Sequence, residues 1–360
     1  MMSTFNFSAG PAKLPDAVMA KAQSEFTDWQ GQHSSVMEIS HRSSAFMAVA
    51  EAAEQNLRSL LAVPNNYKVL FVQGGGRGQF AGVPLNFSEQ GQRALHLVSG
   101  SWSKGAVAES AKYNDAQIIA SAEKVDGLSV FNPVTYEADA NDAYCHFCPN
   151  ETVDGVAFDW LPDVGSVPLV ADMSSTILSQ PLDVSKFGVI YAGAQKNIGP
   201  SGLSVVIVRE DLLGKAQSIT PSFLDYTLQA KHDSMYNTPP TYSWYLAGLV
   251  FEWLKDQGGL EHMAKVNKAK SELLYNAIDN SDFYANPVAV ANRSKMNVPF
   301  TLADSELDSV FLSEALDSGL QALKGHRMVG GMRASIYNAM PIEGVQALVA
   351  FMQEFERKYG

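Results

Sequence analysis

Hydrophobic and polar positions along the first half of the chain follow two different patterns. From Asp16 to Trp29, apolar residues at Val18, Ala22 and Phe26 recur with helical spacing, and residues 46–60 repeat this pattern. Short apolar runs then predict seven strands, at residues 68–72, 94–98, 116–120, 144–147, 168–171, 188–192 and 203–208. Several of these runs are continuous, which is typical of strands covered on both faces. With helical stretches such as SKGAVAESAKY between them, they predict an α/β fold around a largely parallel sheet.

The pattern changes after a helical block that ends near residue 280. From about residue 285, strand-like segments (KMNVPFTL, LQALK, MRASIYN) alternate with two amphipathic helices (ELDSVFLSEALDSG, IEGVQALVAFMQEFERKYG), which indicates a smaller α+β unit. A chain of 360 residues is also long for a single core. We therefore expect a large α/β domain over residues 16–260, and a small domain over residues 261–360 that includes the N-terminal segment 1–15.

Composition narrows the class of protein. The net charge of −12 and the lack of any Lys/Arg-rich block argue against binding to nucleic acid or anionic membranes. No apolar run approaches the roughly 18 residues of a membrane span, and no secretory signal is visible, so we expect a cytoplasmic protein. Cys145 and Cys148 form a C-x-x-C pair that could be redox-active or half of a zinc site. Their strand-like setting and the lack of a second ligand pair favour two reduced structural thiols and no metal.

One lysine stands out in the segment FGVIYAGAQKNIGPSG, residues 187–202. Lys196 follows a buried strand and is surrounded by small residues. A partly desolvated amine that a carbonyl carbon can approach is suited to covalent chemistry, although a loop lysine that caps a turn is the alternative. Asp172, in PLVADMSS, also ends a strand, and ligands of parallel sheets lie beyond such strand ends. Asp172 could instead cap the next helix, so the pair indicates a ligand only together with further signals.

Those further signals describe an anion and a flat ring. The segment FVQGGGRGQFAG, residues 71–82, joins a strand to a helix through glycines and suits a phosphate, yet it matches neither the ATP nor the dinucleotide fingerprint. Trp102, just past another strand end, could stack on a ring or pack in the core. Basic residues in glycine- or serine-containing loops suit carboxylates and phosphates, with surface ion pairs as the alternative: His41, Arg42, His326, Arg327 and Arg333. Together these features fit pyridoxal 5′-phosphate (PLP).

Motifs along nearly the whole chain closely resemble those of the bacterial-type phosphoserine aminotransferases, which are class-V aminotransferases. They are FNFSAGPAKLP, SVMEISHRS, GGGRGQF, CPNETVDG, DMSS, AGAQKNIGPSG, NTPPTYSWY, MNVPF and GHRMVGGMRASIYNA. The resemblance implies a fold-type I PLP enzyme, active as a homodimer with shared active sites. It implies reversible ping-pong amino transfer from L-glutamate to 3-phosphohydroxypyruvate in serine biosynthesis. It also implies amination of 3-hydroxy-2-oxo-4-phosphooxybutanoate in pyridoxine biosynthesis.

The same resemblance implies a role for each matching residue. Lys196 corresponds to the Schiff-base lysine, Asp172 to the partner of the pyridine nitrogen, and Trp102 to the ring-stacking tryptophan. Thr152 corresponds to the hydroxyl that hydrogen-bonds the ring oxygen. The phosphate cup corresponds to Gly76, Arg77 and Gln195, with Asn237 and Thr238 from the neighbouring subunit. The substrate-binding set corresponds to Arg333 for the α-carboxylate, and to His41, Arg42, His326 and Arg327 for the far anion.

Two other classes of function compete with this interpretation. A cysteine desulfurase on the same scaffold needs a mobile nucleophilic cysteine, and both cysteines lie on a predicted strand. A non-catalytic anion-binding or dehydrogenase-like module is the other alternative. The missing dinucleotide fingerprint argues against a dehydrogenase, and a lack of affinity for PLP would favour a simple anion-binding module.

Overall fold

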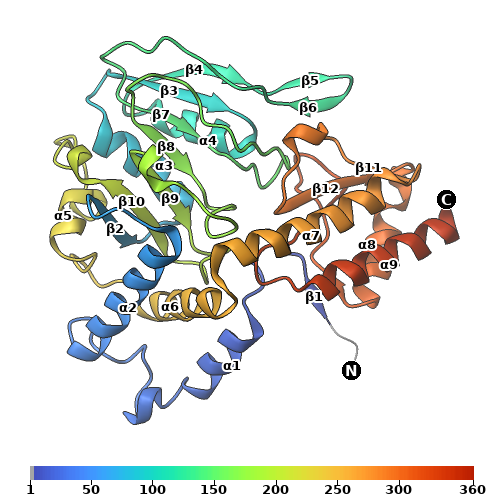
Figure 1. Cartoon of the computed structure of the whole chain (residues 1–360), viewed down its shortest axis with the longest axis horizontal. Coiled ribbons are helices and arrows are strands. Elements are labelled where there is room, and N and C mark those ends of the chain that lie inside the picture. Colours follow the sequence, from blue (N-terminus) through green and yellow to red (C-terminus); the bar gives the residue numbers. More distant parts are fainter. Residues whose placement is uncertain (1–3) are drawn as a thin grey trace.

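The computed structural model describes residues 4–360 and contains two groups of helices and strands, each around its own hydrophobic core (Figure 1). The elements of the first group are α1 (Asp16–Ser24), α2 (Ser44–Leu61), β2 (Tyr67–Val72), α3 (Gly75–Phe87), β3 (Arg93–Val98), α4 (Ser101–Ser110), β4 (Asp115–Ser121), β5 (Glu123–Val125), β6 (Leu128–Val130), β7 (Cys145–Phe147), β8 (Leu169–Asp172), β9 (Val189–Gly193), β10 (Ser204–Arg209), α5 (Tyr226–Lys231) and α6 (Thr241–Asp256). The long helix α7 (Gly259–Asp279) follows. The second group holds β1 (Phe5–Asn6), β11 (Tyr284–Ala285), β12 (Asn297–Leu302), α8 (Asp308–Asp317), β13 (Leu320–Gln321), β14 (Met332–Ser335) and α9 (Ile342–Tyr359).

A seven-stranded sheet forms the centre of the first group, in the order β2-β10-β9-β8-β7-β3-β4. Strand β10 runs antiparallel to both of its neighbours, and the other pairs are parallel. Alternate residues of the strands face two helical layers, with α2 and α6 on one side and α3, α4 and α5 on the other. All seven predicted strands are present, and the predicted mostly parallel sheet is confirmed. Because β8 and β9 are parallel neighbours, Asp172 and Gly193 end at the same edge of the sheet.

The second group is built on a small antiparallel sheet, β11-β12-β14, covered by α8, α9 and the end of α7. Strand β1 pairs in parallel with β13 in a separate two-stranded sheet, and this pairing brings the N-terminal segment to the second group. Helix α7 contributes to both cores: Leu260 and Met263 belong to the first, and Leu274 and Ile278 to the second. In Figure 1, α7 accordingly runs from the large group of elements to the small one.

Two predicted elements differ from the structure, and one observed hairpin was not predicted. The helix predicted over residues 16–29 was too long: α1 ends at Ser24, and Trp29 lies buried in a separate 3₁₀ turn. Phe26 is 46% exposed and packs edge-on against Tyr242, so its helical spacing did not mark a buried face. The predicted strand at residues 320–324 is limited to β13, and the exposed β5–β6 hairpin was not predicted because its residues bury no hydrophobic face.

Two buried histidines predict that the protein loses stability in acid. His96 and His146 are cross-strand neighbours, and burial lowers the pKa of His96 to about 4 and that of His146 well below its ordinary value. The unfolded chain titrates at the ordinary value of about 6.5, so it binds more protons than the folded chain as pH falls below 6.5. The stability that the two neutral histidines contribute is therefore fully present above pH 6.5 and is lost as the pH falls toward 4.

We expect His96 alone to lower the free energy of unfolding by about 2 kcal/mol between pH 7 and pH 5. Urea unfolding at the two pH values measures this, and His96→Phe should reduce the pH dependence by that amount. The same substitution at the exposed His262, His262→Phe, is the matched variant for comparison. Equal pH dependence in wild type and His96→Phe would contradict the prediction.

Candidate active site

Lys196 lies in a buried turn directly after β9 and lines a cavity of about 280 Å³. Its Nζ donates a hydrogen bond of 2.5 Å to Oγ1 of Thr152 and lies 5.6 Å from the centre of the Trp102 ring. The cavity is lined by Gly74, Gly75, Gly76, Arg77, Phe80, Trp102, Asn150, Thr152, Asp172, Ser174, Ser175, Gln195 and Lys196. Seven of the fourteen predicted site residues are thus brought together in one cavity: Gly76, Arg77, Trp102, Thr152, Asp172, Gln195 and Lys196.

The buried position of Lys196 changes its acid–base chemistry. Burial lowers the pKa of the Lys196 amine to about 8, while Asp172 and Glu151 act in the opposite direction. A lysine of this kind is partly neutral near pH 8, whereas an exposed lysine with a pKa near 10.4 is almost entirely charged. The amine therefore combines access to a cavity with the protonation state that a nucleophile requires.

Asp172 presents a carboxylate with one oxygen occupied and one free. Its Oδ1 accepts hydrogen bonds from the backbone N–H and the hydroxyl of Ser174, at 2.9 and 2.6 Å. Among residues 4–360, no group donates a hydrogen bond to Oδ2. Burial raises the pKa of Asp172, and Ser174 and Lys196 oppose this shift. Because turns rather than a helix follow β8, Asp172 does not cap a helix, and its free oxygen suits a cationic N–H of a ligand.

The glycine segment lies at the N-terminus of α3, in the wall of the same cavity. Gly74 and Gly75 have φ values of 99° and 62°, which side chains other than hydrogen disfavour. A Cβ on Gly76 would lie 3.3 Å from the Ser174 hydroxyl, so the backbone approaches β8 closely here. The first N–H groups of a helix lack partners within the helix and carry a partial positive charge. This end of the cavity is therefore suited to a phosphate.

Two acidic residues that the sequence interpretation did not assign hold Trp102 in place. Glu151 accepts hydrogen bonds from the backbone N–H groups of Trp102 and Ser103, both at 2.8 Å, and Asp154 accepts one from Ser101 at 2.7 Å. These bonds fix the first turn of α4, which carries the indole. Burial also raises the pKa of Glu151 to about 7. The signal was present in the segment NETVDG, whose acidic residues lie on both sides of Thr152.

Arg333, from the second group of elements, does not line the cavity but contacts Thr152, which does. It lies on β14, and its guanidinium donates a hydrogen bond of 3.2 Å to the backbone carbonyl of Thr152. Its Nε is buried and has no hydrogen-bond partner among the described residues. Since Thr152 also contacts Lys196, one residue links the arginine to the lysine. An unsatisfied guanidinium N–H beside the cavity is suited to a carboxylate.

The remaining predicted residues do not line this cavity. Thr238 lies near the glycine segment only through its backbone carbonyl, which accepts a hydrogen bond from Gln73 at 2.8 Å, and Asn237 is exposed. His41 and Arg42 contact each other at 3.3 Å in the segment before α2. His326 and Arg327 lie in a turn between β13 and β14, which is exposed at Arg327. The structure thus leaves these two HR pairs apart from Lys196 within a single chain.

A cluster of buried amides behind the cavity was also missed. Asn197, next to Lys196, accepts a hydrogen bond from the backbone N–H of Asn338 at 3.0 Å. Asn338 in turn donates to the Leu178 carbonyl at 2.8 Å and accepts from Asn267 of α7 at 2.8 Å. These contacts join the lysine segment, α7 and the segment after β14 that follows Arg333. Each pair is separated by at least 71 residues, so no local pattern reveals it.

The residues of the cavity fit PLP. Asp172 Oδ2 suits a protonated ring nitrogen, the start of α3 suits the phosphate, and Lys196 suits the aldehyde. The ring nitrogen of Trp102 is buried without a partner, and both Lys196 and Arg77 lie near its ring, at 5.6 and 5.3 Å from its centre. The indole therefore borders the space between the lysine and the helix N-terminus.

We expect Lys196 to be the lysine that reacts fastest with an amine reagent at pH 8 in the cofactor-free protein. Only the neutral amine is nucleophilic, and its pKa of about 8 is well below that of exposed lysines. Labelling with a trace of acetic anhydride from pH 6 to pH 11, followed by mass spectrometry of the peptides, measures this. Labelling of Lys196 should reach half of its maximum near pH 8, and the exposed Lys186 is followed in the same samples for comparison. Parallel profiles for the two lysines would show that burial does not activate Lys196.

Comparison with known proteins agrees with this geometry. Residues 4–348 match the family model described as aminotransferase class-V. Phosphoserine aminotransferase from Bacillus circulans subsp. alkalophilus is similar over 99% of both chains, with 45% identity and a TM-score of 0.93. PLP-bound phosphoserine aminotransferase from Trichomonas vaginalis is 39% identical over 98% of this chain and 100% of its own, with a TM-score of 0.90.

A third solved structure is a phosphoserine aminotransferase in which radiation damage of the Schiff base was followed. Its sequence is 42% identical over 99% of this chain and 100% of its own, with a TM-score of 0.94. These matches confirm the predicted fold-type I architecture and the class of PLP-dependent transaminases. The chain belongs to the class-V aminotransferase family and, within it, to the phosphoserine aminotransferases.

Proposed function

We propose that this protein catalyses reversible amino transfer between L-glutamate and 3-phosphohydroxypyruvate, which gives 2-oxoglutarate and O-phospho-L-serine. The observation that carries the proposal is the buried Lys196 amine, which shares one cavity with the free oxygen of Asp172 and is linked through Thr152 to the unsatisfied Nε of Arg333. The phosphoserine aminotransferases at 39–45% identity support the choice of substrates.

Different residues of the cavity have different roles in this reaction. When bound, PLP supplies an electron-withdrawing ring that stabilises negative charge on the substrate Cα. Asp172 would hold the ring nitrogen by accepting its hydrogen bond and would keep it protonated. Lys196 would take the proton from the substrate Cα as a general base and would later return one as a general acid. Its pKa of about 8 suits both directions.

The substrate is held at its two ends. Arg333 binds the α-carboxylate through its buried guanidinium. The far end is a carboxylate in glutamate and a phosphate in the other substrate, and we assign it to His41, Arg42, His326 and Arg327. Guanidinium and imidazolium groups can accept either anion, because both anions present paired oxygens. One site can therefore serve both half-reactions, which predicts ping-pong kinetics.

We further propose that the active protein is a homodimer in which a second copy supplies Asn237 and Thr238 to the phosphate end of the cavity. Neither residue lines the cavity of its own chain. Large apolar side chains near this segment in sequence are exposed, such as Ile219 at 65% and Phe223 at 47%, as expected of a surface that another chain covers.

Three broader assignments complete the proposal. The two hydrophobic cores support a large domain over residues 16–260 and a small one over 261–360 with the N-terminal segment 1–15.

Cys145 and Cys148 are both free and buried, in keeping with a cytoplasmic location, and no helix within residues 4–360 is long and apolar enough to cross a membrane. We also propose 3-hydroxy-2-oxo-4-phosphooxybutanoate as a second acceptor, because it carries the same oxo-acid and phosphate ends.

A visible absorption spectrum tests the proposed function. Purified protein loaded with PLP should be yellow, lose this band on addition of L-glutamate, and regain it with 3-phosphohydroxypyruvate. Recovery only with a different oxo-acid would reject the proposed acceptor and keep the transaminase. A protein that shows no band even after addition of PLP would overturn the role given to Lys196.

A further inference from the structure

A second cavity shares the lining residue Asn150 with the active-site cavity. It has a volume of about 290 Å³, close to the 280 Å³ of the cavity that holds Lys196. Because the two volumes are nearly equal, the second cavity has room for a ligand with a ring system comparable to a substituted pyridine.

The interior of this second cavity suits a flat apolar group. Its aromatic lining consists of Phe147, Phe158, Trp160 and Phe187. Phe158 and Trp160 stack on each other at 4.4 Å, so they present a fixed surface rather than two mobile rings. Aromatic side chains of this kind bind planar rings by stacking and edge contacts.

Lys295 and Asn150 each present a polar group of the lining without a partner, and the exposed carboxylate of Asp159 lies on the same lining. Lys295 is exposed, and no described carboxylate lies within ion-pair distance of its ammonium group. Oδ1 of Asn150 is buried without a hydrogen-bond donor, although its Nδ2 donates to Ser175 and Asn297 at 2.8 and 2.9 Å. A buried amide oxygen of this kind costs free energy unless a donor reaches it. A ligand that satisfies both groups has an anion at one end and an N–H or O–H at the other.

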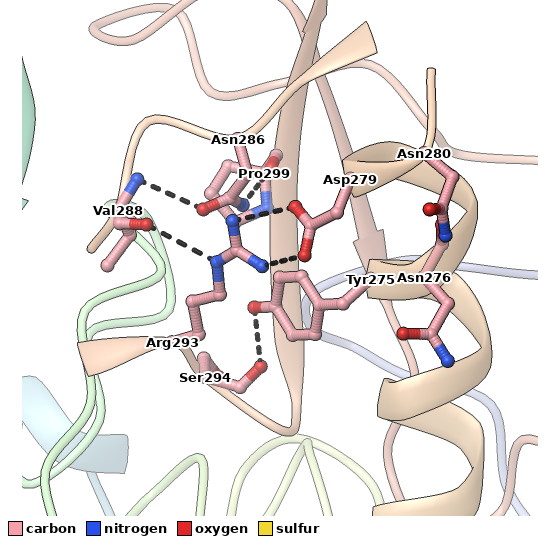
Figure 2. Close-up of polar contacts among 9 residues, drawn as sticks. All are labelled: Tyr275, Asn276, Asp279, Asn280, Asn286, Val288, Arg293, Ser294 and Pro299. Atoms are coloured by element: carbon pink, nitrogen blue, oxygen red, sulfur yellow. Dashed lines mark hydrogen bonds and ion pairs between the residues drawn. The ribbon is translucent and has the colours of Figure 1, made fainter. Parts of the chain in front are cut away.

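The wall that carries Lys295 is held rigidly. Figure 2 shows Arg293 in a two-bond ion pair with Asp279 of α7, with N–O distances of 2.6 and 2.8 Å. The same guanidinium donates to the Val288 carbonyl at 3.3 Å and lies 4.8 Å from the centre of the Tyr275 ring. These bonds leave Lys295, rather than Arg293, as the cation available to a ligand. They also fix the wall in advance, which lowers the entropic cost of binding.

We propose that this second cavity binds an aromatic carboxylic acid whose ring carries an N–H or O–H group. The ring lies among Phe158, Trp160 and Phe187, the carboxylate pairs with Lys295, and the ring donor reaches Asn150 Oδ1. Indole-3-acetate is the simplest probe with all three features. The ligand would contact the segment of residues 157–161, the turn after β8 and the segment before β12 at the same time.

Ligand-observed NMR titration of the PLP-loaded protein tests the proposal. We expect saturable binding of indole-3-acetate with a dissociation constant of about 1 mM or lower, as for a ligand of this size. Naphthalene-1-acetate, which lacks the N–H, should bind about tenfold more weakly. Lys295→Met should weaken binding about threefold to fivefold, and the matched Lys265→Met on α7 should not.

Filling variants locate the ligand. Ala157→Leu and Ala291→Leu, on separate segments of the lining, should each remove saturable binding, so the test holds if either variant folds. Arg333→Ala should keep the affinity within twofold, because Arg333 does not line the second cavity. Absence of saturable binding to the wild type would overturn the proposal. So would binding that survives both filling variants, or binding that L-glutamate displaces and Arg333→Ala abolishes, since the latter would place the ligand in the active site.

Discussion

Lys196→Ala is expected to lower turnover at least about 1000-fold, because it removes the amine to which we assign both the attachment of the cofactor and the transfer of the Cα proton. The variant should still retain PLP without a covalent bond. Asp172, the helix N-terminus of α3 and Trp102 remain in place, since none of them depends on Lys196 for its own hydrogen bonds. Single-turnover assays with L-glutamate and equilibrium dialysis of PLP measure the two effects separately.

The matched control for this experiment is Lys186→Ala. Lys186 is exposed and lies in the turn before β9, so its loss should leave both turnover and PLP binding at wild-type values. Turnover of Lys196→Ala close to that of wild type would contradict the assignment of Lys196. Loss of PLP binding together with turnover would show that the covalent bond, rather than the shape of the cavity, retains the cofactor.

Local sequence patterns were sufficient to predict the central part of this site. Lys196 and Asp172 each follow a continuous apolar run, and the structure places those runs as adjacent parallel strands, β8 and β9. Because parallel neighbours end at one edge of a sheet, the two side chains had to lie near each other. The glycine segment was predictable for a similar reason, since a strand joined to a helix by glycines leaves N–H groups at the end of the sheet.

Residues that act through distant contacts could not be predicted in this way. Glu151 fixes Trp102 from 49 positions away, and Asn338 contacts Asn197 across 141 positions. An asparagine or glutamate in a loop has many possible partners, and hydropathy does not distinguish among them. In helix α1 the sequence pattern predicted too much structure instead of too little. Phe26 has helical spacing yet lies beyond the end of the helix, because apolar spacing alone does not mark where a helix stops.

The two HR pairs illustrate a third limit of the sequence. Their residue types indicated anion binding, but residue type does not reveal which chain completes a site. His41, Arg42, His326 and Arg327 all lie outside the cavity of the single chain. The proposed homodimer offers a physical reason for separating such residues: a cationic cluster built from several segments and two chains brings its charges together only on assembly, so no single chain must hold them against mutual repulsion.

The segment that follows Arg333 depends on one buried lysine, whose pKa burial lowers to about 7. Lys270 of α7 is fully buried, and its Nζ donates hydrogen bonds to the carbonyls of Ile336, Tyr337 and Met340, at 3.0, 2.7 and 3.0 Å. An ammonium group has three N–H donors, so all of them are used. No other side chain in the described residues donates to these three carbonyls. Lys270 therefore fixes the turn between β14 and α9, from which Asn338 contacts the residue after Lys196.

Lys270→Met is expected to lower the free energy of unfolding by about 3 kcal/mol, because it keeps the length of the side chain and removes the side-chain donor to three buried carbonyls, of which that of Tyr337 keeps the backbone N–H of Met340 as a donor. The same change should raise the KM for L-glutamate severalfold more than it lowers kcat, since it frees the segment that follows Arg333 but touches no group that moves a proton. Urea unfolding and steady-state kinetics measure the two effects. Lys268→Met, at an exposed position on the same helix, should change the free energy of unfolding by less than about 0.5 kcal/mol and leave KM unaltered. A Lys270→Met protein with wild-type stability would mean that water satisfies the three carbonyls, and a loss confined to kcat would mean that Lys270 acts on the proton transfer at Cα rather than on the position of Arg333.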